Sequence, residues 1–248
     1  MPKFLWNMYA YCYDAITGLA PYQDMLDDVV EALEVAPGMR VLDAGCGTGV
    51  LAERLAVACP ELEVVAVDLS PAMLKRARAR RAWPASFSFV DGAIEDVLAR
   101  DLRGFDRVAS VNVIWALPDP QDTFAKMAGR LRPSGRMVHT TPRWRFRADV
   151  IVWRHFSKLR GRALARALLG LPKLLLAGLL NLLLVGQSLL LTRGSNAKRR
   201  WEADGLARLL GAAAVPPRLV KACYAGQGLL LVCEKAFPAT PDPPEERG

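Results

Sequence analysis

The chain has 248 residues and a formal net charge of +8, and 52% of its residues are hydrophobic. This length suits one α/β domain with an insertion better than two independent domains. The five cysteines are odd in number and none belongs to a Cys-x-x-Cys pair, so neither a zinc clip nor a dithiol redox centre is indicated. The N-terminus has no unbroken apolar core, and we therefore expect a cytoplasmic protein without a secretory signal.

The positive charge is concentrated in one segment, residues 144–200. With Asp149 as its one acidic residue, this segment carries +11, which leaves −3 for the rest of the chain. Such a localised excess indicates a localised anionic partner. The basic residues of the segment are Arg145, Arg147, Arg154, Lys158, Arg160, Arg162, Arg166, Lys173, Arg193, Lys198, Arg199 and Arg200.

From residue 40 onward, short apolar or β-branched runs alternate with longer helical stretches. This pattern predicts an α/β fold with a doubly wound, mostly parallel sheet and a C-terminal antiparallel hairpin. The predicted strands are Arg40–Ala44, Glu63–Val67, Phe87–Val90, Arg107–Asn112, Gly135–Thr140, Arg218–Tyr224 and Gly228–Glu234. The predicted helices are Gly49–Ala58, Pro71–Arg81, Pro120–Leu131 and Glu202–Leu210.

A glycine-rich turn joins the first predicted strand to the first predicted helix of this pattern. It contains Gly45, Gly47 and Gly49 at alternate positions. Backbone N–H groups at such a turn, together with a helix N-terminus, can hold the polar part of a cofactor, and side chains there would block its approach. A glycine-rich turn that binds no ligand is the alternative.

Acidic residues end the next two predicted strands. Asp68 follows the second strand, where a carboxylate can accept hydrogen bonds from both hydroxyls of a ribose. Asp91 and Gly92 end the third strand, a position that can address an adenine edge. The sequence around the turn thus favours a nucleoside-containing cofactor.

Two other nucleotide sites fit the turn less well. A nicotinamide dinucleotide fingerprint requires a third glycine or alanine where this chain has Val50, and it usually lacks an acid such as Asp43 two residues before its first glycine. A P-loop is excluded because no Gly-Lys-Ser/Thr follows the turn.

Residues 41–49, Val-Leu-Asp-Ala-Gly-Cys-Gly-Thr-Gly, and residues 67–74, Val-Asp-Leu-Ser-Pro-Ala-Met-Leu, closely resemble the first two motifs of the class I S-adenosylmethionine (SAM)-dependent methyltransferases. Residues 105–108 and 131–136 resemble the entry to the fourth strand and the turn before the fifth strand of that family. The resemblance covers about residues 38–141 and resumes at about 201–235. It implies a Rossmann-like fold with SAM as the cofactor.

The resemblance also implies which residues bind SAM. The turn with Asp43, Gly45, Gly47 and Gly49 would contact the methionine part of SAM, and Asn112 would lie beside the sulfonium. Asp68 would bind the ribose hydroxyls. Leu69 and Met73 would contact the face of the adenine ring, and Asp91 and Gly92 would bind the adenine amine. Residues 9–14, Tyr-Ala-Tyr-Cys-Tyr-Asp, resemble the Tyr-Asp lid of ubiquinone-biosynthesis-type and phospholipid-type methyltransferases. An aromatic helix face packed on the core is the alternative for this segment.

On this basis we expect five parts in the chain. They are an N-terminal helical lid (1–36), a SAM-binding core (37–143), a basic and apolar helical insertion (144–200), a helix and strand hairpin that complete the core (201–237) and a disordered tail rich in proline and acidic residues (238–248).

The insertion is longer than the family's minimal connection between the fifth strand and the last helix. Residues 168–191 contain Lys173 as their one charged residue, and the nineteen residues 174–192 would span roughly 28 Å as a helix, close to the thickness of a bilayer's hydrocarbon core. A single crossing would separate strands that belong to one sheet. The insertion is therefore expected to be an in-plane helix, a shallow hairpin broken near Gly170 and Pro172 or at Gly178, or a buried cap or dimer interface.

Basic residues on both sides of the apolar run favour an anionic membrane surface as partner, with about 1 kcal/mol for each basic contact. Nucleic acid is an unlikely partner, because nucleic-acid surfaces interleave charge with a few aromatic residues rather than with a membrane-length apolar run. The protein is thus expected on the cytoplasmic side of a membrane, bound peripherally.

Methyl transfer from SAM needs mainly alignment of the acceptor and exclusion of water. The candidate catalytic residues are Tyr9, Tyr13 and His139. Both histidines, His139 and His155, are placed where they could face a substrate cleft at the carboxyl ends of the strands. A surface or packed histidine is the alternative for each, and it is favoured for His155. No metal-ligand cluster is evident, so no metal is predicted. The preferred function is methylation of a lipophilic, membrane-resident acceptor, first a phospholipid headgroup amine and second an isoprenoid quinone. A soluble small-molecule methyltransferase and a noncatalytic SAM-binding scaffold are the alternatives.

Overall fold

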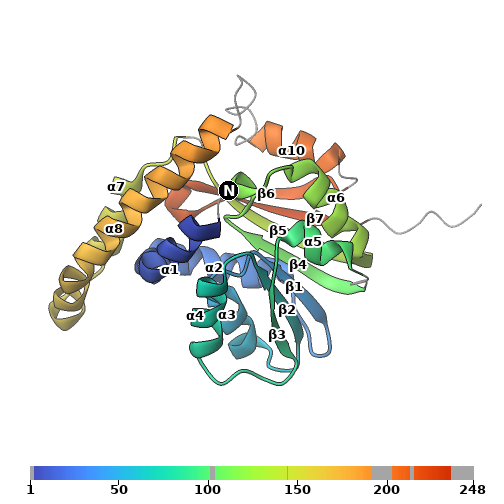
Figure 1. Cartoon of the computed structure of the whole chain (residues 1–248), viewed down its shortest axis with the longest axis horizontal. Coiled ribbons are helices and arrows are strands. Elements are labelled where there is room, and N and C mark those ends of the chain that lie inside the picture. The colour runs from blue at the N-terminus through green and yellow to red at the C-terminus, as the bar shows by residue number, and fades with distance from the viewer. Residues whose placement is uncertain (1–2, 101–103, 144, 192–202, 213–214, 236–248) are drawn as a thin grey trace, which may run out of the picture.

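The computed structural model describes residues 3–100, 104–143, 145–191, 203–212 and 215–235, with the backbone alone for 184–191 and 212. Within these residues, seven strands form one sheet in the order β3-β2-β1-β4-β5-β7-β6 (Figure 1). The expected tail at 238–248 and the basic residues Lys198, Arg199 and Arg200 lie outside the described residues.

The strand pairing is parallel from β3 to β5 and antiparallel for β5 with β7 and for β7 with β6. The predicted α/β, doubly wound class with a C-terminal antiparallel hairpin is therefore confirmed. The strands are β1 (Arg40–Ala44), β2 (Glu63–Asp68), β3 (Phe87–Asp91), β4 (Phe105–Val111), β5 (Leu131–Pro142), β6 (Pro217–Cys223) and β7 (Gly228–Glu234).

Helices cover both faces of the sheet because alternate strand residues point to opposite sides. Val41 of β1 belongs to the core on one face, and Leu42 belongs to the core on the other. The first face packs against α2 (Ala20–Leu33), α3 (Val50–Ala58) and α4 (Pro71–Ala79). The second face packs against α5 (Ile94–Ala99), α6 (Pro120–Arg130) and α10 (Ala203–Ala212), as Figure 1 shows.

Two helices begin as their sequences indicate. Pro71 is the first residue of α4, and the side chain of Ser70 accepts a hydrogen bond of 3.2 Å from the backbone N–H of Met73. Pro120 starts α6 in the same way, with the Asp119 carboxylate accepting from the backbone N–H of Asp122 at 3.0 Å. Such caps satisfy N–H groups that the helix itself leaves unpaired, and they fix the direction in which α4 leaves the end of β2.

In the described part of the chain, three helices lie outside the two layers. They are α1 (Lys3–Thr17), α7 (Ala148–Ser157) and α8 (Gly161–Leu191), and Figure 1 shows α8 running obliquely alongside α1 at one end of the molecule. Ala177 and Leu180 of α8 are buried against Tyr9, Ala10 and Cys12 of α1. The insertion therefore packs on the helix that precedes the sheet, and β5 before it and β7 after it are neighbours in the sheet.

The insertion differs from one of its expected forms. The structure has one helix from Gly161 to Leu191 with Pro172 inside it, so the hairpin broken near Gly170 and Pro172 or at Gly178 is wrong. Proline removes one backbone donor, but the strong helix formers Leu and Ala on both sides of Pro172 continue the helix. The helix α5 was not predicted, because six residues are too short to show a helical period.

Candidate active site at the glycine turn

The glycine turn lies where the strand order reverses, between β1 and its neighbour β4. A crevice at such a point, beyond the carboxyl ends of the strands, is the usual ligand site of an open α/β sheet. The backbone N–H groups of Gly45 and Cys46 donate to the carbonyl oxygen of Val67 at the end of β2, at 2.8 and 2.9 Å. The turn is thus fixed to the strand that ends in Asp68.

The three glycines of the turn have positive φ angles, 82° at Gly45, 56° at Gly47 and 78° at Gly49. A Cβ atom at Gly47 would lie 3.3 Å from Cε1 of Tyr13, and one at Gly49 would lie 3.0 Å from Cβ of Ala77. At Gly45 it would overlap the side chain of Val113. Glycine is thus required at this turn by the backbone and by close protein neighbours as well as by any ligand.

Asp68 is positioned by the backbone around it. Its Oδ2 accepts from the N–H of Gly47 and its Oδ1 from the N–H of Ser70, both at 2.8 Å. Burial raises the pKa of Asp68 above its ordinary value, while these two hydrogen bonds act in the opposite direction. Each oxygen keeps a second lone pair, which fits the acceptor role toward ribose hydroxyls. Leu69, the next residue, is half-buried.

Asp43 is the fully buried acid of the turn. In the described part of the chain its Oδ2 is a buried oxygen without a hydrogen-bond partner. Burial, and then the nearby charge of Asp68, raise the pKa of Asp43 to about 7. An unpaired carboxylate oxygen beside a glycine turn fits a cofactor that carries positive charge, as SAM does on its sulfonium and its ammonium.

The other predicted cofactor residues lie around the same edge of the sheet. Asp91 pairs with Asp68 in the register of β3 and β2, and its carboxylate lies 3.2 Å from Nζ of Lys3 in α1. The backbone N–H of Gly92 donates to the carbonyl oxygen of Asp68 at 3.1 Å. Met73 is buried, and its contacts are with the cluster that joins α1 to α8.

Asp14 fastens α1 to the turn. Its Oδ1 accepts from Oγ1 of Thr48 and from the guanidinium of Arg80, both at 2.7 Å, and its Oδ2 accepts from Arg76 at 2.6 Å. Burial raises the pKa of Asp14, but the hydrogen bonds from Thr48 and Arg76 and the charge of Arg80 hold it below its ordinary value. The carboxylate therefore stays ionised and keeps α1 over the glycine turn.

A group of buried tyrosines lies against the turn. Tyr13 packs edge-on to Tyr9 at 5.2 Å between ring centroids, and Tyr22 of α2 packs edge-on to Tyr224 at 5.6 Å. The hydroxyls of Tyr13 and Tyr22 are hydrogen-bonded at 3.2 Å. Burial raises the pKa of all four tyrosines well above the ordinary value, so their hydroxyls are neutral. Of the two predicted tyrosines, Tyr13 lies against the turn at Gly47 and Tyr9 contacts the Tyr13 ring, and both also pack on the apolar cluster between α1 and α8.

Asn112 directly follows β4 with a left-handed φ of 56°. Its backbone N–H donates to the carbonyl oxygen of Thr140 at 3.0 Å and contacts Oγ1 of Thr140 at 3.2 Å. Its side-chain Oδ1 accepts from Oγ1 of Thr140 at 3.3 Å. Thr140 thereby fixes which way the Asn112 amide faces.

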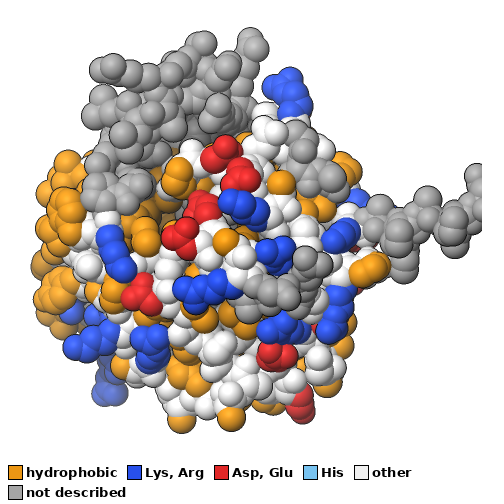
Figure 2. All heavy atoms as spheres, turned by 45° about the vertical axis from the view of Figure 1, so that its right-hand side comes forward, with side chains coloured by type: hydrophobic (Ala, Val, Ile, Leu, Met, Phe, Trp, Pro, Cys, Tyr) orange, Lys and Arg blue, Asp and Glu red, His pale blue; other side chains and the backbone are white. Residues whose placement is uncertain are grey.

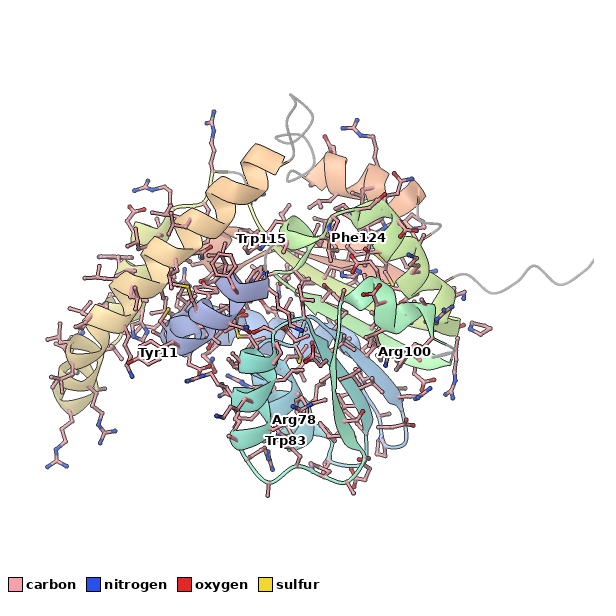
Figure 3. The ribbon with its side chains drawn as sticks, viewed as in Figure 1. Tyr11, Arg78, Trp83, Arg100, Trp115 and Phe124 are labelled. Atoms are coloured by element: carbon pink, nitrogen blue, oxygen red, sulfur yellow. The ribbon has the colours of Figure 1, made fainter. Side chains whose placement is uncertain are left out.

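The expectation that His139 faces a substrate cleft is wrong. His139 is fully buried within β5, and its ring packs edge-on to Phe124 of α6 at 4.4 Å between centroids, on the opposite side of the sheet from the tyrosines. Burial lowers its pKa to about 3, and among the described residues neither ring nitrogen has a hydrogen-bond partner. Phe124, labelled in Figure 3, is itself fully buried. The other histidine, His155, is a packing residue whose Nδ1 accepts from the backbone N–H of Ala20 at 3.0 Å.

Sequence reasoning missed Tyr22, Tyr224, Thr140 and Arg80. None of them lies in a local motif. Tyr22, in α2, and Tyr224, in the short helix η2 (Tyr224–Gly226), reach this region only through the tertiary fold. Arg80 offered a weak signal as a basic residue just after the helix that follows Asp68. Among the described residues, no group of three or more His, Cys, Asp or Glu side chains could hold a metal ion.

Comparison with known proteins identifies the segment that contains this site. Residues 41–135 match the family model described as a methyltransferase domain. A ubiquinone biosynthesis O-methyltransferase of Xanthomonas campestris is 34% identical over 115 residues, which are 46% of this chain and 47% of that protein. One of Xylella fastidiosa is 37% identical over 105 residues, 42% of each chain. This chain therefore matches about half the length of these curated relatives.

Solved structures agree on the fold. The N-methyltransferase NodS of Bradyrhizobium japonicum, crystallised with S-adenosyl-L-homocysteine, has a TM-score of 0.55 at 16% identity and covers 88% of both chains. A SAM-dependent methyltransferase of Aquifex aeolicus has a TM-score of 0.56 at 12% identity, over 87% of this chain and 89% of that one. Residues 41–135 thus match a methyltransferase domain, and these likenesses show that the chain shares the fold of solved SAM-dependent methyltransferases.

Proposed function

We propose that this chain transfers the methyl group of SAM to a lipophilic acceptor that resides in a membrane. The observation that carries the proposal is the position of α8, which packs with one side on α1, the helix over the glycine turn, and turns leucines outward on the other. An acceptor whose apolar tail stays in the membrane could in this way reach the turn beside α1.

The outward side of α8 is unusually apolar for a protein surface. Among the described residues, one helix, Gly161–Leu183, is long and apolar enough to cross a membrane, with a mean hydropathy of 1.7. Its exposed leucines recur on one side of the helix at the spacing of an α-helical period. They are Leu168, Leu169, Leu175, Leu176, Leu179, Leu182 and Leu183. Figure 2 shows hydrophobic side chains gathered along the margin of the molecule on which Figure 1 places α8.

The flanks of this leucine face are basic. Arg162, Arg166 and Lys173 follow one another along α8 at spacings that put them on one side of the leucines, and all three are exposed. Arg154 of α7 and Lys158, which directly follows α7, add two further exposed cations, and Nζ of Lys158 lies 3.5 Å from Oδ2 of Asp24. Apolar side chains bordered by cations are typical of a helix that lies in the plane of an anionic membrane. A crossing helix is disfavoured, because β5 and β7 on either side of the insertion are paired.

Two acceptor classes are compatible with this proposal. The matched relatives carry the name ubiquinone biosynthesis O-methyltransferase, which supports a hydroxyl of an isoprenoid quinol ring. A phospholipid headgroup amine is the second candidate, and the basic flanks of α8 support a phospholipid surface as its source.

The test uses SAM labelled in its methyl group and the full chain with three kinds of phosphatidylcholine vesicle. One contains a geranyl-substituted catechol, one contains phosphatidylethanolamine, and one contains neither. We expect label in the lipid phase with the catechol vesicles. Label in phosphatidylethanolamine instead would establish the amine acceptor, and SAM binding without transfer to any lipid would mean a noncatalytic SAM-binding protein.

The membrane part of the proposal has its own test. Charge reversal at Arg160 and Arg162, both exposed, should weaken binding to vesicles that contain phosphatidylglycerol and leave SAM affinity unchanged. High salt should imitate the double variant, because the Debye length falls from about 8 Å at physiological ionic strength as salt increases. If the double variant and the parent float with such vesicles equally well at low salt, these cations do not contact the membrane. A dimer that buries the leucine face would then be the better explanation.

A further inference from the structure

The helix α1 turns a row of large apolar side chains outward. Phe4, Met8 and Tyr11 are spaced by four and three residues, so they lie on one side of the helix, and they are 60%, 52% and 63% exposed. We call these three residues the α1 stripe. A single exposed apolar residue is ordinary on a protein surface, whereas a contiguous row of large ones indicates a contact with a partner.

The other sides of α1 are used inside the protein. Tyr9 and Cys12 are buried in the cluster that α1 forms with α8. On the side toward the glycine turn, Oδ1 of Asn7 accepts from Oγ of Ser70 at 2.7 Å, and Asp14 accepts from the side chains around the turn. These contacts fix the rotation of the helix about its axis, so the α1 stripe is held facing away from the protein.

The α1 stripe borders the leucine face of α8. Nζ of Lys173 in α8 lies 5.6 Å from the centroid of the Tyr11 ring, which is labelled in Figure 3. Leu169 and Leu176 come four residues before and three residues after Lys173, and they therefore lie beside it on the surface of α8, where both are exposed. Two apolar surfaces on different helices thus meet, with one cation between them.

The charges around the α1 stripe are positive. Asp14 is the one acidic residue of α1, and it is ion-paired with Arg76 and Arg80 at 2.6 and 2.7 Å. Lys75 and Arg76 are exposed on α4 on one side of α1, and Lys173 is exposed on α8 on the other. Cations at both borders of an apolar row fit an anionic lipid surface. In a twofold contact between two copies of the chain the same cations would face one another, which disfavours a dimer through this surface.

We propose that α1 is a second membrane-contacting helix: Phe4, Met8 and Tyr11 enter the apolar boundary of an anionic lipid membrane beside the leucine face of α8, with Lys173 among the headgroups. The inference rests on the proposed membrane association of α8 and extends the contact to the helix that lies over the glycine turn. The membrane and the turn then lie on two sides of one helix. The reactive group of an acceptor has to rise from the membrane by about 10 Å, the diameter of a helix, while its apolar tail stays in place.

The test is flotation of the full chain with vesicles of phosphatidylcholine and phosphatidylglycerol at low salt. In the triple variant Phe4→Gln, Met8→Gln and Tyr11→Gln, glutamine keeps a high helix propensity and removes the apolar surface. We expect vesicle affinity to fall at least about fivefold, because less apolar area is buried on binding. SAM affinity, measured by calorimetry without vesicles, should be unchanged. Val57→Gln with Leu219→Gln is the matched control, since both residues are exposed on other elements, and it should bind as the parent does.

A single charge gives a second readout at one exposed position. Met8→Asp should weaken binding to the anionic vesicles more than Val57→Asp, which adds the same charge at a 72% exposed residue of α3, while Met8→Leu should bind as the parent does. Equal flotation of the two aspartate variants, or parental flotation of the triple variant, would overturn the inference.

Sedimentation without vesicles distinguishes a membrane from a second copy of the chain. A triple variant that sediments as a monomer where the parent sediments as a dimer would also overturn the inference, because the α1 stripe would then be an interface between copies. If the parent itself does not float with the phosphatidylglycerol vesicles, it is the proposed membrane association that fails.

Discussion

The Asp68 carboxylate reaches from the end of β2 to the glycine turn and accepts a hydrogen bond of 2.8 Å from the backbone N–H of Gly47. One side chain thus organises the turn and presents lone pairs at its edge. We predict that Asp68→Ala weakens SAM binding by about 1.5 to 3 kcal/mol, the range for hydrogen bonds to a charged group. Isothermal calorimetry measures this directly. Asp96→Ala, at an exposed acid of α5, is the control, and equal SAM affinity in both variants would refute the role of Asp68.

Gly47 tests whether the turn tolerates a side chain. Gly47→Ala adds a methyl group 3.3 Å from the Tyr13 ring at a φ of 56°, so it combines backbone strain with a close contact. We expect methyl transfer to fall more than a hundredfold, and Gly47→Val to abolish it, because α1 must shift away from the turn. Gly38→Ala separates the two causes, since Gly38 has a φ of 78° and open space around the added Cβ. It should lose about 1 kcal/mol of stability and keep its activity.

The buried Asp43 should make the stability of the free protein depend on pH. Its pKa is raised from 3.8 to about 7, so the folded state holds a proton that the unfolded state releases. The stabilisation is complete below pH 3.8 and is lost as pH rises to about 7. At most about 4 kcal/mol is involved, at about 1.4 kcal/mol for each unit of pKa. We predict that Asp43→Asn removes this decrease in folding stability with rising pH.

The measurement is urea unfolding of the parent and Asp43→Asn at several pH values between the two pKa values. The free energy of unfolding of the parent should fall relative to the variant as pH rises. Asp96→Asn, at an exposed carboxyl group, should follow the parent throughout. A constant difference between the parent and Asp43→Asn across this range would mean that Asp43 is already ionised in the folded protein.

The leucine face of α8 gives a prediction that does not depend on the reaction. Leu175, Leu179 and Leu182 are 71%, 57% and 71% exposed, so changing all three to serine should leave the melting temperature within a few degrees of the parent. Flotation with vesicles that contain phosphatidylglycerol should fall severalfold, since apolar burial contributes about 25 cal/mol per Å². The matched control is the pair Val57→Ser and Leu219→Ser, which are exposed apolar residues on α3 and β6. Equal loss of binding in the control would argue against a specific membrane face.

Local sequence determined the elements of the sheet and the turn. The strands β1 and β7 have the bounds that the apolar runs predict, and Ser70 with Pro71 marks the start of α4. These features depend on neighbours a few residues apart, through side-chain alternation, capping and the freedom of glycine. The order of the motifs also carried the family resemblance.

Tertiary structure decided which side chains meet. His139 lies near the end of a strand, where a catalytic residue would be expected. Its side chain points to the face of the sheet that α6 covers, so it is a core residue. Tyr22 has no motif of its own and reaches Tyr13 because α2 packs beside the turn. The contact of α8 with α1 likewise depends on packing between segments more than 150 residues apart. Such contacts depend on the total apolar surface that distant segments bury against one another, so they cannot be predicted from a local pattern of residues.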